Sequence, residues 1–113
     1  MTPEGKVKRW IHDQLDNLLP GCVIYRPLGG AYGKAGEPDI HVTYMGCKGV
    51  IEAKVEYEDA TPIQWKRLRD YSKAGALAMI IRGKDHQRLQ YFAKLMKERG
   101  ECLEHILKRQ TYG

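Results

Sequence analysis

The chain has 113 residues, which is enough for one domain with a single hydrophobic core and too few for two. Its 19 Lys and Arg against 14 Asp and Glu give a formal charge of +5, which suits a polyanionic partner. Three widely spaced cysteines without a C-x-x-C pair argue against disulfides or a zinc site, and no apolar run reaches the length of a membrane span or a signal peptide. We therefore expect a single domain over residues 1–113, located in the cytoplasm.

The first segment predicts an amphipathic helix. Thr2 is a good N-cap, Pro3 suits the first helical position, and Pro20-Gly21 ends the pattern. Glu4 falls on the apolar stripe, where it is either an ordinary first-turn acid favoured by the helix dipole or an inward-facing group. The stripe itself consists of Val7, Trp10, Ile11, Leu15 and Leu18.

A short strand is predicted next, over Cys22–Arg26, followed by a glycine-rich loop from Pro27 to Gly36 that contains Lys34. The loop lacks the spacing of a phosphate-binding P-loop. Two readings stay open: it is a plain connection, or it approaches nucleic acid through glycines that allow close backbone contact and through Lys34.

Two strands joined by a turn form the central feature of the sequence. Ile40–Tyr44 alternates in polarity, Met45–Lys48 reads as a turn, and Gly49–Val55 reads as the return strand. Side chains two residues apart on a strand share a face. We therefore expect the polar residues of this hairpin to gather on one face of a sheet.

Folding the strands about a four-residue turn places Asp39 opposite Lys54 and His41 opposite Glu52. Two carboxylates and one amine then meet at the open end of the hairpin. Carboxylates about 4 Å apart repel by roughly 4 kcal/mol near a protein surface, so a cation between them is favoured. That cation is either the lysine or a divalent metal such as Mg²⁺.

The following segment predicts a second helix with a capping box, in which Thr61 is the N-cap, Pro62 is N1 and Gln64 is N3. Gly75 ends this helix. Its basic side chains make either a solvated face or a track for nucleic-acid phosphates. They are Lys66, Arg67, Arg69 and Lys73.

The remaining chain predicts a buried strand at Ala78–Ile81 and a helix capped by Asp85 and ended by Gly100. A short terminal helix is expected over Cys102–Arg109. Without this terminal segment, the predicted order is helix, three strands, helix, strand, helix.

At its hairpin the sequence resembles a known family. Pro38-Asp39 followed by Glu52-Ala53-Lys54 resembles the PD-(D/E)xK nuclease signature. The surroundings, with Gly36, the segment Thr61–Gln64 and Gly75, are similar to its VRR-NUC branch in a standalone, phage-type form. The resemblance implies an α/β fold with a restriction-endonuclease-like core (α-β-β-β-α-β) and a central mixed sheet flanked by helices.

The resemblance also implies a site. Asp39, Glu52 and the carbonyl of Ala53 would hold Mg²⁺ or Mn²⁺, and Lys54 would orient or deprotonate a water or stabilise developing charge. Supporting positions would be filled by Gln64, contacting the water or a phosphate in addition to any capping role, and by Glu4 near the metal.

The implied activity is that of a metal-dependent endonuclease that hydrolyses DNA phosphodiester bonds. Because one site cuts one strand, a homodimer acting on branched DNA such as four-way junctions is expected, in phage DNA replication or repair. Two alternatives stay open: a catalytically silent DNA-binding module on the same fold, and an RNA-processing nuclease of the superfamily.

Overall fold

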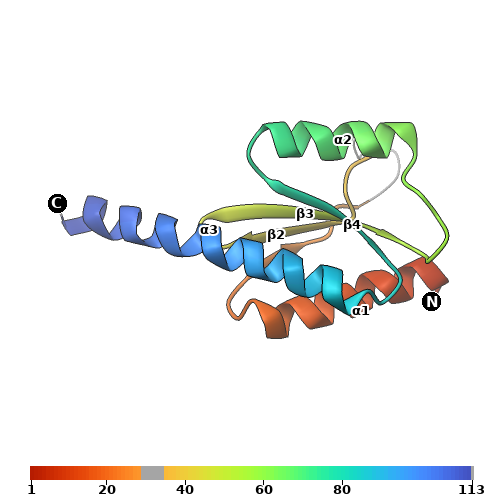
Figure 1. Ribbon diagram of the computed structural model, residues 1–113, viewed down its shortest axis with the longest axis horizontal. Coiled ribbons are helices and arrows are strands. Elements are labelled where there is room, and N and C mark those ends of the chain that lie inside the picture. Colours follow the sequence, from red (N-terminus) through yellow and green to blue (C-terminus); the bar gives the residue numbers. More distant parts are fainter. Residues whose placement is uncertain (29–34, 113) are drawn as a thin grey trace.

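The computed structural model of the protein describes residues 1–28 and 35–112, with side chains described as far as residue 100. This part of the chain folds into a four-stranded sheet flanked by helices, and the strand order is β1-β2-β3-β4 (Figure 1). β1, β2 and β3 pair antiparallel, whereas β3 and β4 pair parallel, so the sheet is mixed as predicted. The elements are α1 (Pro3–Leu18), β1 (Val23–Tyr25), β2 (Ile40–Tyr44), β3 (Cys47–Lys54), α2 (Pro62–Lys73), β4 (Leu77–Arg82) and α3 (His86–Tyr112).

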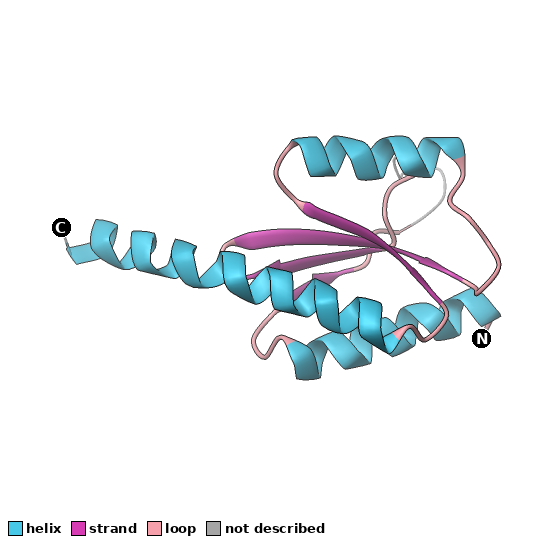
Figure 2. Ribbon diagram, viewed as in Figure 1, coloured by secondary structure: helices cyan, strands magenta, loops and turns pink. Residues whose placement is uncertain are grey.

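The helices lie on both faces of the sheet. A parallel pair of strands needs a crossover connection, and α2 supplies it between β3 and β4. Figure 2 shows α2 on one side of the sheet and α1 with α3 on the other. Lys34 lies outside the described residues.

Strand alternation divides the apolar residues between the two faces. The larger cluster joins the sheet to α1 and α3, and it includes Ile51 of β3 and Phe92 of α3. The smaller one lies beneath α2 and consists of Val50, Ala60, Leu68 and Ile80. The side of the sheet that faces α2 therefore has room for polar groups.

The start of α1 has the predicted N-cap residue and the predicted proline in its first turn. The Thr2 hydroxyl accepts a hydrogen bond of 3.0 Å from the Gly5 backbone amide, and proline occupies the first turn. The buried residues of the helix are Val7, Ile11 and Leu15.

The β2–β3 turn is tighter than predicted. Tyr44 pairs with Cys47, so only Met45 and Gly46 form the loop, instead of the four residues Met45–Lys48. Both have positive φ, 51° and 85°, which is the type I′ geometry that matches the twist of the flanking strands.

This shorter turn changes the register of the hairpin. Ile40 pairs with Ile51, so one step further along the ladder Asp39 lies opposite Glu52. The predicted pairing of Asp39 with Lys54 is therefore wrong by two residues. A two-residue displacement keeps every side chain on its predicted face, because side chains alternate with a period of two.

The predicted end of the last helix at Gly100 is also wrong, since α3 continues to Tyr112 and includes the segment expected as a separate helix. A Cβ atom at Gly100 would lie 2.6 Å from Cβ of Met45 and 3.3 Å from the carbonyl oxygen of Tyr44. The glycine thus lets α3 pass close to the β2–β3 turn. Beyond that point α3 extends away from the sheet (Figure 1).

Gly49 of β3 provides a test of this packing. A Cβ atom there would lie 2.5 Å from Cζ of Phe92. We expect Gly49→Ala to lower the free energy of unfolding by about 1–3 kcal/mol through overpacking, measured by urea denaturation. In a Phe92→Leu background the same change should cost less. An equal cost in both backgrounds would contradict this account of the packing.

Candidate active site

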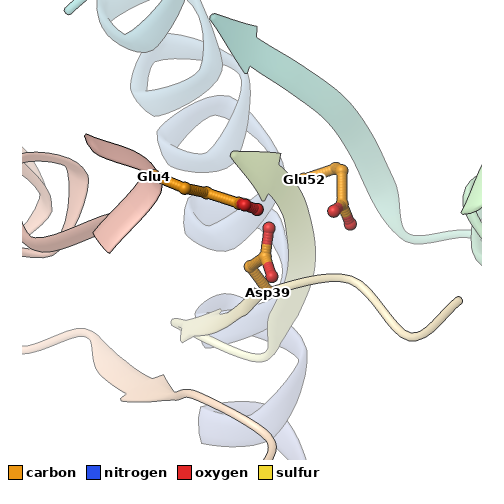
Figure 3. Close-up of side chains that lie close together, drawn as sticks. All are labelled: Glu4, Asp39 and Glu52. Atoms are coloured by element: carbon orange, nitrogen blue, oxygen red, sulfur yellow. The ribbon is translucent and has the colours of Figure 1, made fainter. Parts of the chain in front are cut away.

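Three carboxylates from separate parts of the chain converge at one end of the sheet. Glu4 lies in the first turn of α1, Asp39 directly precedes β2, and Glu52 lies in β3. One carboxylate oxygen from each residue lies within 4.8 Å of the other two (Figure 3). The first turn of α1 therefore directs Glu4 towards the other two carboxylates.

The hairpin register explains why Asp39 and Glu52 meet. They lie opposite each other one step beyond the last paired residues of β2 and β3. The Ala53 backbone amide donates a hydrogen bond of 2.9 Å to Oδ2 of Asp39 and fixes that carboxylate against β3.

The same backbone directs the Ala53 carbonyl towards the cluster. The next carbonyl, that of Lys54, accepts a hydrogen bond of 2.7 Å from the Gly83 amide, on the β4 side. In a strand the amide and carbonyl of one residue point to the same side, and those of the next residue point to the other. The carbonyl of Ala53 therefore points to the side on which its amide meets Asp39.

Glu52 is the most deeply buried of the three acids. Its exposed fraction is 1%, and Oε2 has no hydrogen-bond partner among the described residues. Burial, and then the neighbouring Asp39 charge, raise the pKa of Glu52 to about 8. A buried carboxylate oxygen without a partner costs free energy, so its retention points to a function or a missing ligand.

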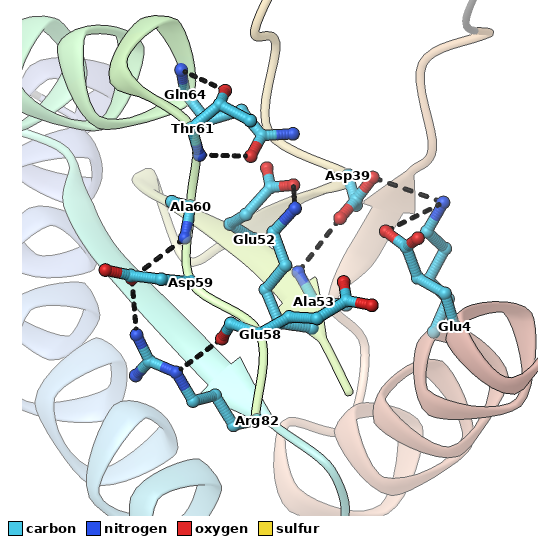
Figure 4. A network of polar contacts seen from close by, with 12 residues as sticks. Glu4, Asp39, Glu52, Ala53, Glu58, Asp59, Ala60, Thr61, Gln64 and Arg82 are labelled. Carbon is cyan, nitrogen blue, oxygen red and sulfur yellow. Dashed lines mark hydrogen bonds and ion pairs between the residues drawn. The ribbon is translucent and has the colours of Figure 1, made fainter. Parts of the chain in front are cut away.

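Two lysines partly offset the negative charge. Nζ of Lys54 lies 3.9 Å from Oε1 of Glu52. Nζ of Lys8 lies 3.2 Å from Oδ1 of Asp39 and 4.0 Å from Oε1 of Glu4. Figure 4 labels the three acids and marks their polar contacts with dashed lines. Lys8 was not among the predicted site residues, although its position four residues after Glu4 on one helix was a usable signal.

The donor set fits a hard divalent cation. Mg²⁺ and Mn²⁺ prefer carboxylate and carbonyl oxygens, which are the groups that Asp39, Glu52 and Ala53 direct to this point. Carboxylates within 4.8 Å repel one another by about 3 kcal/mol per pair near a protein surface. A divalent ion would remove that repulsion and give the buried oxygen of Glu52 a partner.

The segment that carries Asp39 is held against the start of α2. Gly36 has a φ of +75°, and a Cβ atom there would lie 2.7 Å from the carbonyl oxygen of Ile63. The Arg67 Nε donates a hydrogen bond of 3.0 Å to the carbonyl of Ala35. Glycine is required at Gly36 both by its backbone conformation and by this close approach.

A further attachment involves Glu37, which sequence reasoning missed. The Tyr71 hydroxyl donates a short hydrogen bond to Oε1 of Glu37, and Nε2 of His41 lies 3.0 Å from the same oxygen. Burial, then the bond to Glu37, raise the pKa of Tyr71 to about 12, whereas burial, then the Lys48 charge, lower the pKa of His41. These contacts join β2, α2 and the Asp39 segment.

His41 is not where the predicted hairpin placed it. It pairs with Val50, so the predicted pairing with Glu52 is wrong. The cause is the same two-residue turn that displaces Asp39. His41 instead packs edge-on to Tyr71, with ring centroids 5.4 Å apart.

Gln64 forms the predicted capping box. Its side-chain Oε1 accepts a hydrogen bond of 2.9 Å from the Thr61 backbone amide, and its backbone amide donates one of 3.3 Å to the Thr61 hydroxyl (Figure 4). The capping box thus uses the side-chain oxygen of Gln64 and leaves the side-chain nitrogen, Nε2, available to another group.

The basic residues of α2 differ in their surroundings. Lys66 and Arg67 both contact Asp70, at 3.1 and 3.3 Å. Lys73 is exposed in the last turn, and Arg69 lines a cleft beside β4.

Comparison with sequences yields one partial match. No protein-family model matches the chain. The threonine–tRNA ligase of Methanoregula boonei is 34% identical over 88 residues, which are 72% of this chain but 13% of the ligase. The chain thus spans only a small part of that protein's length.

Comparison with solved structures identifies the fold. Two structures described as VRR_NUC domains match with TM-scores of 0.67 and 0.64, at 21% and 19% identity, covering 83% and 86% of this chain and 97% and 90% of theirs. Hjc of Archaeoglobus fulgidus, a Holliday junction resolvase, matches with a TM-score of 0.55 and 19% identity, covering 70% of this chain and 67% of Hjc. The chain therefore has a restriction-endonuclease-like fold.

Within that class, the arrangement is the one seen in VRR-NUC domains, which confirms the predicted resemblance at the level of the fold. No helix in the part of the chain that the structure describes is long and apolar enough to cross a membrane.

The raised pKa of Glu52 predicts a pH-dependent stability. The folded state holds the Glu52 proton more tightly than the unfolded state does, with a pKa of about 8 against a usual 4.5. The resulting stabilisation of the folded state is fully present below the unfolded-state pKa of 4.5 and is lost as pH rises through the folded-state pKa of about 8. Without divalent metal, the free energy of unfolding should therefore fall between about pH 5 and about pH 8.

Chemical denaturation across this pH range, without metal, measures the effect. Glu52→Gln should remove most of the decrease, because the amide does not titrate. An equal decrease in wild type and Glu52→Gln would contradict the assignment.

Proposed function

We propose that this protein is a divalent-metal-dependent nuclease that hydrolyses phosphodiester bonds in DNA. The observation that carries the proposal is the convergence of Glu4, Asp39 and Glu52 within 4.8 Å, with a buried oxygen of Glu52 that has no hydrogen-bond partner among the described residues. The likeness of the fold to VRR_NUC domains and to a Holliday junction resolvase supports the same activity.

Asp39, Glu52 and the carbonyl of Ala53 would hold Mg²⁺ or Mn²⁺, and Glu4 would complete the site from α1. A bound divalent ion supplies a water of lowered pKa and offsets charge on the scissile phosphate. The Ala53 amide keeps Asp39 in position through its bond to Oδ2.

Lys54 and Gln64 would act on the water and the phosphate. Nζ of Lys54 lies beside the buried Glu52 and offers hydrogen-bond donors to a water or a phosphate oxygen. The Gln64 amide nitrogen, which the capping box leaves available, offers a further donor. The phosphates flanking the cut would contact the basic residues predicted for this role, which are Lys34, Lys66, Arg67, Arg69 and Lys73.

The substrate we propose is branched DNA, including four-way junctions, cut by a homodimer in phage DNA replication or repair within the bacterial cytoplasm. One site cuts one strand, so two sites related by a two-fold axis are needed to cut both strands of a symmetric junction. That the A. fulgidus protein is a Holliday junction resolvase supports this substrate.

Cleavage assays test the proposal directly. Purified protein is incubated with and without Mn²⁺ with labelled single-stranded, duplex, flap and four-way-junction DNA. We expect metal-dependent cleavage with a preference for branched substrates. Asp39→Asn and Lys54→Ala should lower the cleavage rate by about a hundredfold or more while DNA binding persists, because the first removes a metal ligand and the second removes a donor to the water or phosphate.

Asp16→Asn and Lys97→Ala serve as matched controls, since they change exposed residues of α1 and α3 in the same way. They should leave the rate unchanged. Binding of junction DNA without cleavage of any substrate would refute the nuclease and favour a catalytically silent DNA-binding module. Cleavage of RNA in preference to matched DNA would favour an RNA-processing enzyme.

A further inference from the structure

A cleft of about 220 Å³ lies along the outer edge of β4, between α2 and α3. Figure 1 shows these two helices on opposite sides of β4. The floor of the cleft is apolar, and Trp65, with an exposed fraction of 38%, borders it. Its other apolar lining residues are Leu68, Ala78, Met79 and Ile80.

The cleft is adjacent to the carboxylate cluster. In the parallel pairing of β3 with β4, Ile80 is the partner of Glu52 and Arg82 is the partner of Lys54. Neighbouring strands are about 4.8 Å apart, so the floor of the cleft lies one strand away from the site. The two sites therefore lie within the span of one nucleic acid strand, on either side of the β3–α2 connection whose Glu58 and Asp59 contact Arg82 (Figure 4).

Three arginines surround the opening, namely Arg69, Arg82 and Arg88. Arg82 pairs with Asp59 at 2.7 Å, whereas neither Arg69 nor Arg88 has an ion-pair partner among the residues whose side chains are described. The rim therefore carries excess positive charge beside a flat aromatic surface. Such a combination suits a phosphate on the rim and a base stacked within.

The same arginines make a second copy of the chain a poor occupant. Nε of Arg88 donates a hydrogen bond of 2.7 Å to the carbonyl of Ile80, which occupies the edge of β4 where another strand would pair. Two such rims facing each other would also bring like charges together.

We propose that this cleft is a binding site for one unpaired nucleotide of the DNA substrate, with the base against Trp65 and its phosphate on the Arg69 and Arg88 side chains. A volume of about 220 Å³ is of the size of a single base, and bases in a continuous duplex are stacked within the helix and cannot enter. The inference rests on the proposed function, because it names the part of a branched substrate that the protein recognises.

Tryptophan fluorescence tests the proposal in EDTA, where no cleavage occurs. Trp10→Phe removes the other tryptophan while keeping an aromatic ring against His86. In this background, oligothymidylate of about 12 nucleotides should quench Trp65 in a saturable way, and a blunt duplex of equal length should not.

Binding measured by fluorescence anisotropy provides the second readout. Trp65→Ala should weaken oligothymidylate binding by about tenfold and duplex binding by less than about twofold. Tyr91→Ala, which removes an aromatic side chain that is 55% exposed on α3, should change neither. Thermal unfolding checks that each variant folds.

Three results would overturn the inference: unchanged Trp65 fluorescence at saturating oligonucleotide, equal weakening of both DNA forms by Trp65→Ala, or a loss of self-association in that variant by sedimentation. Failure of the nuclease is distinguishable, because it appears as absent cleavage with Mn²⁺ while these binding measurements are made without metal.

Discussion

Electrostatic repulsion between Asp39 and Glu52 is the constraint on which the rest of the site depends. The two-residue turn fixes the register of β2 and β3, and that register holds the two carboxylates opposite each other. Glu4 adds a third negative charge, and burial deprives Glu52 of the water that would otherwise screen it. Burial and this repulsion account for the raised pKa of Glu52, and the repulsion accounts for the approach of Lys8 and Lys54 to the carboxylates. A divalent cation would resolve it more completely than either lysine.

The rest of the fold holds the carboxylates close to one another despite their repulsion. One face of the sheet is an apolar core packed on α1 and α3, and it supplies stability without contributing to the chemistry. The other face, beneath α2, carries Glu52 and Lys54, while Asp39 directly precedes β2 and Glu4 reaches the site from α1. Contacts from the first turn of α2 to Gly36 and from Tyr71 to Glu37 hold the segment that positions Asp39. We infer that α2 has two roles, since it covers the sheet and also orders a site residue that precedes it in the chain.

Much of this could be predicted from the sequence, because the relevant signals are local. Alternation along the strands, the caps at Thr2 and Thr61 and the order of elements each depend on neighbouring residues. The hairpin register could not be predicted, because it depends on two consecutive positive φ angles and methionine is not a typical residue for the first of them. The prediction that Gly100 ends the last helix was wrong, because this glycine is explained by its close contact with the β2–β3 turn, which is distant in sequence. The bond between Tyr71 and Glu37 joins residues 34 positions apart and leaves no local signal.

The most direct test of the account is a crystal structure of the protein grown with Mn²⁺ and measured at a wavelength where manganese scatters anomalously. The account predicts an anomalous peak bound by carboxylate oxygens of Asp39 and Glu52 and by the carbonyl of Ala53, with Lys8 displaced from Asp39. The peak should be absent from a Glu52→Gln crystal treated in the same way. Ordered carboxylates with no anomalous peak between them, at a manganese concentration that supports cleavage, would contradict the central claim that this cluster is a metal site.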